Sequence, residues 1–151
     1  MAGELLLATS ALVSLLDRLR PFHTACALSF DEWNGPVIST EAVLTEATHL
    51  LGHVAGGRRA CIDFFLGGGA ILVPSSAASL RRARELVIRH SDLPMHYAEA
   101  TLVALGEDLD TNLIFTTDRR AFGVCRLYGR KSFRILPSTS TRAQARARAR
   151  P

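Results

Sequence analysis

The stretch LLLATSALVSLLDR, residues 5–18, decides which fold this chain is expected to adopt. Its first part is a short apolar run typical of a buried strand. Thr9 or Ser10 then supplies an N-cap for an amphipathic helix that we expect to reach about Arg20, with an apolar face that includes Leu19. Sites in parallel α/β sheets form at the carboxyl ends of strands. A metal site at this strand end would need a carboxylate, but the chain has Ala8.

The rest of the chain continues to alternate between strand and helix patterns. Strands are expected at 37–39, 70–74, 112–117 and 132–137, and helices at 23–33, 40–53, 58–66, 76–90 and 95–109, with a short helix or turn at 118–125. This alternation predicts an α/β fold with a central parallel sheet of four to five strands and helices on both faces. The residues that follow the strands, such as Ser10 and Thr116, are therefore the first candidates for a site.

Length and charge favour one domain followed by an arginine-rich segment. The 151 residues suit a single domain of ordinary size, which we assign to residues 1–137. The net charge of +4 comes from the four arginines of the low-complexity segment 138–151, because the rest of the chain has equal numbers of basic and acidic residues. We expect this segment to be disordered, either as a solvated tail or as an arm that attracts phosphate.

Cysteine usage and hydropathy predict a cytoplasmic protein. Cys26, Cys61 and Cys125 lie far apart and lack the spacing of metal ligands, which suits a reducing compartment and a role as small core residues. No apolar run approaches the roughly 20 residues that cross a bilayer, so we expect no membrane association.

Three acidic residues stand where such a sheet could bring them together. Asp118 follows the strand at 112–117, and its alternative role is to cap the next helix. Glu46 lies among apolar residues at helical spacing, so it is either partly buried for a purpose or at the edge of the apolar stripe. Glu99 shares a helix face with His96, and the alternative interpretation of that pair is an exposed hydrogen bond.

An all-carboxylate site would favour phosphate chemistry. Oxygen ligands suit Mg²⁺ or Mn²⁺ rather than Zn²⁺, and these ions hold phosphate oxygens and activate water for in-line attack. A basic segment with two interleaved aromatic residues, Tyr128 and Phe133, follows Asp118; its basic residues are Arg119, Arg120, Arg126, Arg130, Lys131 and Arg134. The segment is either a track for nucleic acid or a solvated basic edge.

At these residues the chain resembles PIN domains, specifically the VapC-like ribonuclease toxins of bacterial toxin–antitoxin pairs. The resemblance runs from Leu5 to Pro137. LLLATSALVSLLDR is similar to the family's opening strand and helix, and VISTEAVLTEATHLLG to the segment with its helical acid. SDLPMHYAEATLVALGEDL is similar to the third motif and IFTTDRRAF to the Thr-x-Asp motif. The last two motifs are the most specific, because of their order and separation.

The resemblance implies a PIN-like three-layer domain with Mg²⁺- or Mn²⁺-dependent endoribonuclease activity on RNA. It also implies a homodimer and a cognate antitoxin that blocks the site. The metal ligands implied by the matching positions are Glu46, Glu99 and Asp118. The supporting groups are His96 as a further ligand or base and the hydroxyls of Thr9, Ser10 and Thr116. Arg119 and Arg120 would hold a substrate phosphate, beside Arg126, Arg130 and Lys131.

Four positions depart from the family's pattern. The leading Asp is Ala8, the acids usual at positions 96 and 99 are His96 and Glu99, and an acid often found at 121 is Ala121. The loss of a carboxylate at position 8 should weaken a site for a hard cation considerably. Three explanations fit Ala8: an introduced change that silences a toxic enzyme, natural drift in a weakly active homologue, or a catalytically inactive PIN-like module that binds RNA or protein.

Overall fold

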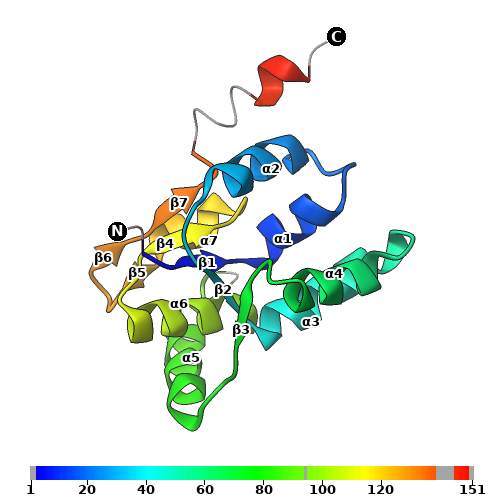
Figure 1. Cartoon of the computed structure of the whole chain (residues 1–151). Helices are drawn as coiled ribbons and strands as arrows, with labels where there is room; N and C mark the ends of the chain where they lie inside the picture. Colours follow the sequence, from blue (N-terminus) through cyan, green and yellow to red (C-terminus); the bar gives the residue numbers. More distant parts are fainter. Residues whose placement is uncertain (1–2, 94, 139–144, 150–151) are drawn as a thin grey trace.

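The computed structural model describes residues 3–93, 95–138 and 145–149, and its centre is a parallel sheet (Figure 1). The strands of this sheet are β1 (Leu5–Leu7), β2 (Val37–Thr40), β3 (Ile71–Val73), β4 (Leu113–Phe115) and β7 (Arg134–Leu136). Their spatial order is β3-β2-β1-β4-β7, and each neighbouring pair is parallel. The predicted α/β fold, with a parallel sheet of four to five strands, is confirmed.

Helices cover both faces of the sheet. They are α1 (Thr9–Leu16), α2 (His23–Glu32), α3 (Glu41–Leu50), the 3₁₀ helix η1 (Leu51–His53), α4 (Gly57–Leu66), α5 (Ala77–Arg89), α6 (Tyr97–Leu109) and α7 (Arg119–Val124). Leu6 of β1 faces α6, on which α5 packs. Phe115 of β4 faces the other side, where its ring stacks on Phe30 of α2 with centroids 6.4 Å apart. Phe30 also contacts Phe64 of α4, which completes this layer.

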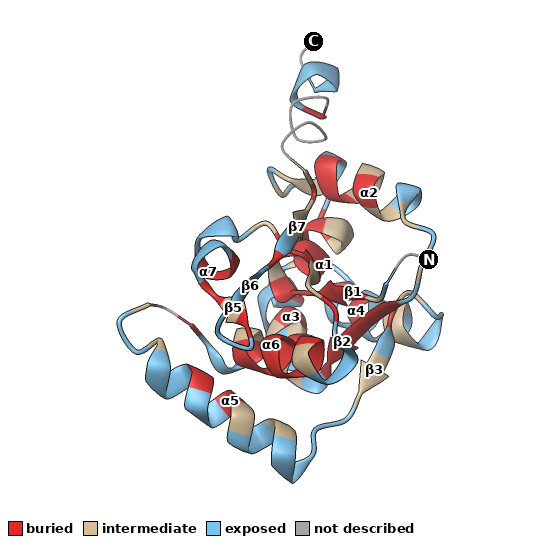
Figure 2. Ribbon diagram, turned by 90° about the vertical axis from the view of Figure 1, so that its left-hand side faces the viewer, coloured by how far each residue is buried: buried red, intermediate tan, exposed pale blue. Residues whose placement is uncertain are grey.

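The core lies around β1, the middle strand. Leu5, Leu6 and Leu7 are all buried, since a central parallel strand has helices on both of its faces. Figure 2 shows that burial is concentrated in the inner strands β1 and β2 and in α6, whereas the edge strand β3 is only partly buried and α5 is buried at only a few positions. The three cysteines are buried, in agreement with their predicted role as core residues.

The first helix ends earlier than the sequence predicts. Helix α1 stops at Leu16 rather than near Arg20. The chain leaves the helix at Asp17, whose carboxylate accepts a hydrogen bond from the backbone N–H of Leu19 (3.1 Å). The prediction that Leu19 belongs to the apolar face was therefore wrong, and this side chain is 93% exposed.

A hairpin that the sequence analysis did not predict follows α7. It consists of β5 (Arg126–Leu127) and β6 (Lys131–Ser132), which pair antiparallel. Tyr128 and Gly129 at its turn both have positive φ angles, 54° and 71°. Glu107 of α6 holds the hairpin in place, because its carboxylate accepts from the N–H of Tyr128 (2.7 Å) and from Arg82 of α5 (2.6 and 3.1 Å).

Part of the arginine-rich segment is described. Residues 145–148 form a short helix, in which Ala145 is buried. The predicted disorder covers residues 138–151. Of these, residues 139–144 and 150–151 lie outside the described residues. None of the described helices is both long enough and apolar enough to span a bilayer.

The packing of α6 on the sheet yields a test with a matched control. A Cβ atom at Gly106 would lie 2.9 Å from the carbonyl oxygen of Thr111 and 3.0 Å from Leu6 Cδ1, whereas one at Gly123 of α7 would meet open space. We expect Gly106→Ala to lower the free energy of unfolding by about 1–2 kcal/mol. The steric cost of the added methyl group should exceed the stabilisation that alanine gives a helix relative to glycine. Gly123→Ala should raise it by up to about 1 kcal/mol. Urea denaturation measures both, and a stabilised Gly106→Ala protein would contradict this packing.

Candidate functional site

A cavity of about 440 Å³ lies at the carboxyl ends of β1 and β4, where α1, α3 and α6 come together. It contains every residue that the sequence analysis proposed as catalytic; these are Ser10, Glu46, His96, Glu99, Thr116 and Asp118. The carboxyl end of a parallel sheet is the position where such folds place their ligands. The tertiary structure therefore gathers the predicted residues in one place, and their catalytic roles stay predictions.

Two hydroxyls hold the strand ends of β1 and β4 together. Ser10 Oγ and Thr116 Oγ1 are hydrogen-bonded at 3.0 Å. Ser10 Oγ also accepts from the N–H of Thr117 (2.9 Å), and Thr116 Oγ1 accepts from the N–H of Asp118 (3.0 Å). The hydroxyls thus determine the path of the backbone that carries Asp118.

Asp118 has the geometry of a helix cap. Its Oδ1 accepts hydrogen bonds from the N–H groups of Arg120 (3.1 Å) and Ala121 (3.3 Å), which begin α7. An Asp is a favoured N-cap residue, so the capping alternative from the sequence analysis is present in the structure. The cap uses one carboxylate oxygen, and the side chain also lines the cavity.

Glu99 is the acid whose surroundings disfavour its charge most clearly. Burial raises the pKa of Glu99, and the charges of Glu46 and Asp118 raise it further, while the hydrogen bond and charge of His96 oppose the shift. The hydrogen bond runs from the backbone N–H of His96 to Glu99 Oε2 (2.6 Å). The charges of Glu46 and Asp118 therefore act on Glu99 across the cavity.

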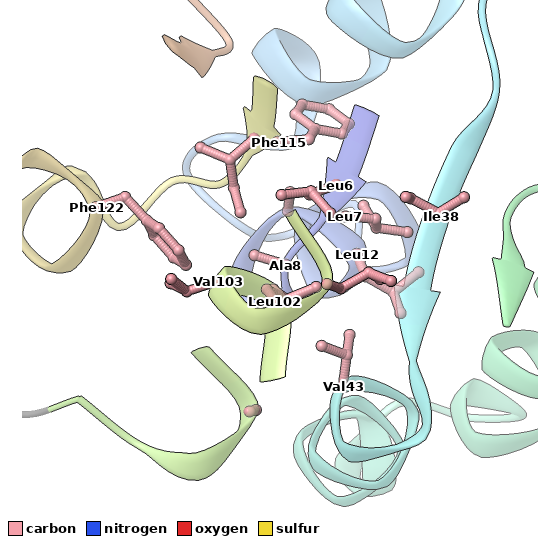
Figure 3. Close-up of a cluster of buried hydrophobic side chains, with 14 of the residues drawn as sticks. Leu6, Leu7, Ala8, Leu12, Ile38, Val43, Leu102, Val103, Phe115 and Phe122 are labelled. Atoms are coloured by element: carbon pink, nitrogen blue, oxygen red, sulfur yellow. The ribbon is translucent and has the colours of Figure 1, made fainter. Parts of the chain in front are cut away.

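Ala8 forms part of the cavity wall where β1 passes into α1. Its side chain is buried beside the apolar groups of Leu102 and Val103 (Figure 3). Ala8 occupies the N-cap position of α1 without a capping side chain. The adjacent Thr9 Oγ1 is buried and has no hydrogen-bond partner among the described residues. The position at which the resembled PIN pattern has a carboxylate is therefore occupied here by a buried methyl group.

The donor chemistry fits a hard cation, but its arrangement does not complete a metal site. Carboxylate and hydroxyl oxygens are suitable ligands for Mg²⁺ or Mn²⁺. Within residues 3–93, 95–138 and 145–149, however, no three His, Cys, Asp or Glu side chains are grouped closely enough to hold a metal ion. Two of the carboxylates instead accept hydrogen bonds from backbone N–H groups.

The basic segment does not enter the cavity. The predicted RNA-binding residues are absent from the described cavity wall; these are Arg119, Arg120, Arg126, Arg130 and Lys131. Two of them bind backbone carbonyls, Arg119 that of Pro137 and Arg126 that of Gly123. The suggestion that Phe133 interleaves this track was wrong, because its ring is buried against Phe122.

Arg20 is a charged residue of the cavity that was not among the predicted site residues. The sequence pattern places Arg20 at the end of the first helix and gives no sign that its side chain faces the strand ends. The sequence signal for Arg20 is its spacing of three residues from Asp17, directly before Pro21. In the structure these two side chains form an ion pair within the turn (3.3 Å).

Comparison with known proteins supports the fold. No protein-family model matches the chain, and no curated protein matches its sequence. The structure is similar to the crystal structure of Mycobacterium tuberculosis VapC20, described as a toxin that cleaves the sarcin–ricin loop. The TM-score is 0.68 at 19% identity, over 77% of this chain and 91% of that chain. The chain has a PIN-like fold.

The environment of Glu99 predicts a pH-dependent loss of stability. Because its pKa is higher in the folded chain than the unfolded value of 4.5, the stability from protonated Glu99 is complete below pH 4.5 and is lost as the pH rises through the raised pKa. We expect Glu99→Gln to be more stable than the parent at neutral pH, with the difference vanishing below pH 4.5. Urea denaturation in EDTA measures this difference.

A second variant checks the cause of this shift. Glu46→Gln removes one of the charges that raise the pKa of Glu99. The pKa of Glu99, followed by NMR of its carboxyl carbon, should therefore fall in Glu46→Gln. An unchanged titration would show that the two carboxylates do not share the cavity.

Proposed function

We propose that this protein is a PIN-type endoribonuclease and acts as the toxin of a toxin–antitoxin pair. The observation that carries the proposal is the approach of three carboxylates, from α3, α6 and the end of β4, to one cavity at the carboxyl end of the sheet. Fold similarity to a toxin that cleaves RNA supports the same conclusion. The charges of Glu46 and Asp118 disfavour the charged form of Glu99, and a bound cation would offset this repulsion.

The proposed cofactor is Mg²⁺ or Mn²⁺, held by Glu46, Glu99 and Asp118. The ion would neutralise phosphate charge and supply a nucleophilic water. Because Glu99 holds its proton more readily than an ordinary carboxyl group, cation binding competes with that proton and strengthens as the pH rises. The missing carboxylate at Ala8 makes this binding weak.

The hydroxyls and the histidine have supporting roles in this proposal. Ser10 and Thr116 keep the Asp118 backbone at the cavity wall through their mutual hydrogen bond. His96 lines the cavity with an exposed side chain, where it can exchange a proton with a phosphate oxygen or with water. Arg119, Arg120, Arg126, Arg130 and Lys131 lie outside the cavity and would contact RNA beyond the cleaved bond.

A second candidate function is a catalytically inactive module that binds RNA or protein. Ala8 favours it, because its buried methyl group stands where a ligand is expected and no complete metal cluster exists in the described part of the chain. A cognate antitoxin and a second copy of the chain belong to the first proposal as partners by resemblance.

The deciding experiment compares RNA cleavage by the chain and by Ala8→Asp, each with Mg²⁺ or Mn²⁺. We expect Ala8→Asp to raise the rate by about tenfold or more, equivalent to at least ~1.4 kcal/mol of transition-state stabilisation. An Asp at this N-cap position would also be expected to cap α1. Binding of Mn²⁺ should raise the Tm of Ala8→Asp more than that of the parent.

Asp118→Asn provides the control for this experiment. Asn is as good an N-cap as Asp, so the fold should persist while the charged ligand is lost. Cleavage by Ala8→Asp that disappears on adding Asp118→Asn would support the proposal. If neither parent nor Ala8→Asp cleaves RNA or responds to Mn²⁺, the catalytic proposal fails and the inactive binding module is the better account.

A further inference from the structure

We propose that Arg20 binds an RNA phosphate in the acidic cavity and that Asp17 is the residue that positions it. This inference rests on the proposed function, because it assigns the substrate contact of the same site. Arg20 lies in the turn between α1 and α2 and lines the cavity together with Glu46 and Asp118.

Asp17 organises this turn. Its side chain is 8% exposed and receives three contacts: the N–H of Leu19 (3.1 Å), Nε of Arg20 (3.3 Å) and Nε2 of His53 (3.5 Å). The backbone hydrogen bond from Leu19, assisted by Arg20 and His53, lowers the pKa of Asp17 against the opposing effect of burial. The carboxylate is therefore charged at neutral pH and restricts the conformations open to Arg20.

The contact with Asp17 leaves the phosphate-binding part of Arg20 unused. Among the described residues, the guanidinium of Arg20 donates a hydrogen bond to Asp17 through Nε and makes no other side-chain hydrogen bond. The two terminal NH₂ groups are then available for a forked contact with a phosphate, and the side chain is 39% exposed. An arginine held by a carboxylate at Nε loses less conformational freedom when it binds such a group.

Arg20 supplies positive charge to a cavity whose other charged residues are mainly acidic. Three carboxylates repel a phosphodiester, and Arg20 is the one arginine or lysine on the described cavity wall. Arg18, two residues earlier, is exposed and lines a different hollow with Leu16 and Val54. Arg18 is therefore a matched control with the same charge in the same turn.

The test measures RNA binding rather than cleavage. A short fluorescein-labelled single-stranded RNA is titrated with full-length protein in EDTA, and the Kd from fluorescence anisotropy is followed against salt concentration. Loss of one phosphate contact should make the slope of log K against log salt shallower by about 0.7. We expect this change for Arg20→Ala and an unchanged slope for Arg18→Ala. Equal slopes for both variants, or no RNA binding by the parent chain, would overturn the inference.

Two further variants separate charge from position. Arg20→Lys keeps the positive charge but not the fork, so it should retain the parent slope and bind RNA more weakly. Asp17→Asn should weaken binding in the parent but cause no further loss in Arg20→Ala, since it acts through that arginine. Equal losses in both backgrounds would exclude the positioning role, and thermal unfolding of each variant verifies that it is folded.

Cleavage assays on the same proteins distinguish this inference from the proposed function. If Ala8→Asp cleaves RNA and Arg20→Ala alters neither cleavage nor the salt slope, the nuclease stands and the inference fails. If no variant cleaves RNA but Arg20→Ala still makes the slope of log K against log salt shallower, the nuclease proposal is rejected. The phosphate contact then stands as part of a binding module.

Discussion

The hydrogen bond between Ser10 and Thr116 is the constraint on which the site depends. It joins the residues that follow β1 and β4, two neighbouring strands more than a hundred positions apart in sequence. Each hydroxyl also accepts a backbone N–H from the segment after β4, so the position of Asp118 is determined by contacts with the first helix. Together with the backbone pairing of β1 and β4, these bonds set the wall of the acidic cavity at the two strand ends.

Within that frame, Glu99 is placed at an energetic cost. Burial and the charges of Glu46 and Asp118 disfavour its charged form, and the hydrogen bond from the His96 N–H at the beginning of α6 offsets part of that cost. A capping hydrogen bond and a cation contact satisfy a carboxylate in the same way, so an acid at this position can serve the fold and the site together. Ala8 stands at the N-cap of α1, where an Asp could have served the fold and the site in the same way.

Positive charge is divided between two regions with different physical character. The basic segment around α7 and the β5–β6 hairpin is largely exposed, and such charges act on a polyanion through long-range, salt-sensitive attraction. Arg20 lies in the cavity wall and is held by Asp17, a carboxylate that is itself almost fully buried. An arginine held by a carboxylate can define where a phosphate lies, whereas exposed surface charges attract a polyanion without fixing its position.

The sequence by itself determined the alternation of strands and helices and the meeting of Glu46, Glu99 and Asp118, because parallel strands place their carboxyl ends along one edge and each acid follows or flanks such an element. It also predicted Ser10 and Thr116, on the same grounds. Only the tertiary structure decided that α1 ends at Leu16, that Arg20 lines the cavity and that Phe133 is buried. Each of these depends on contacts with distant elements, such as His53 for Asp17 and Phe122 for Phe133, which local periodicity does not encode.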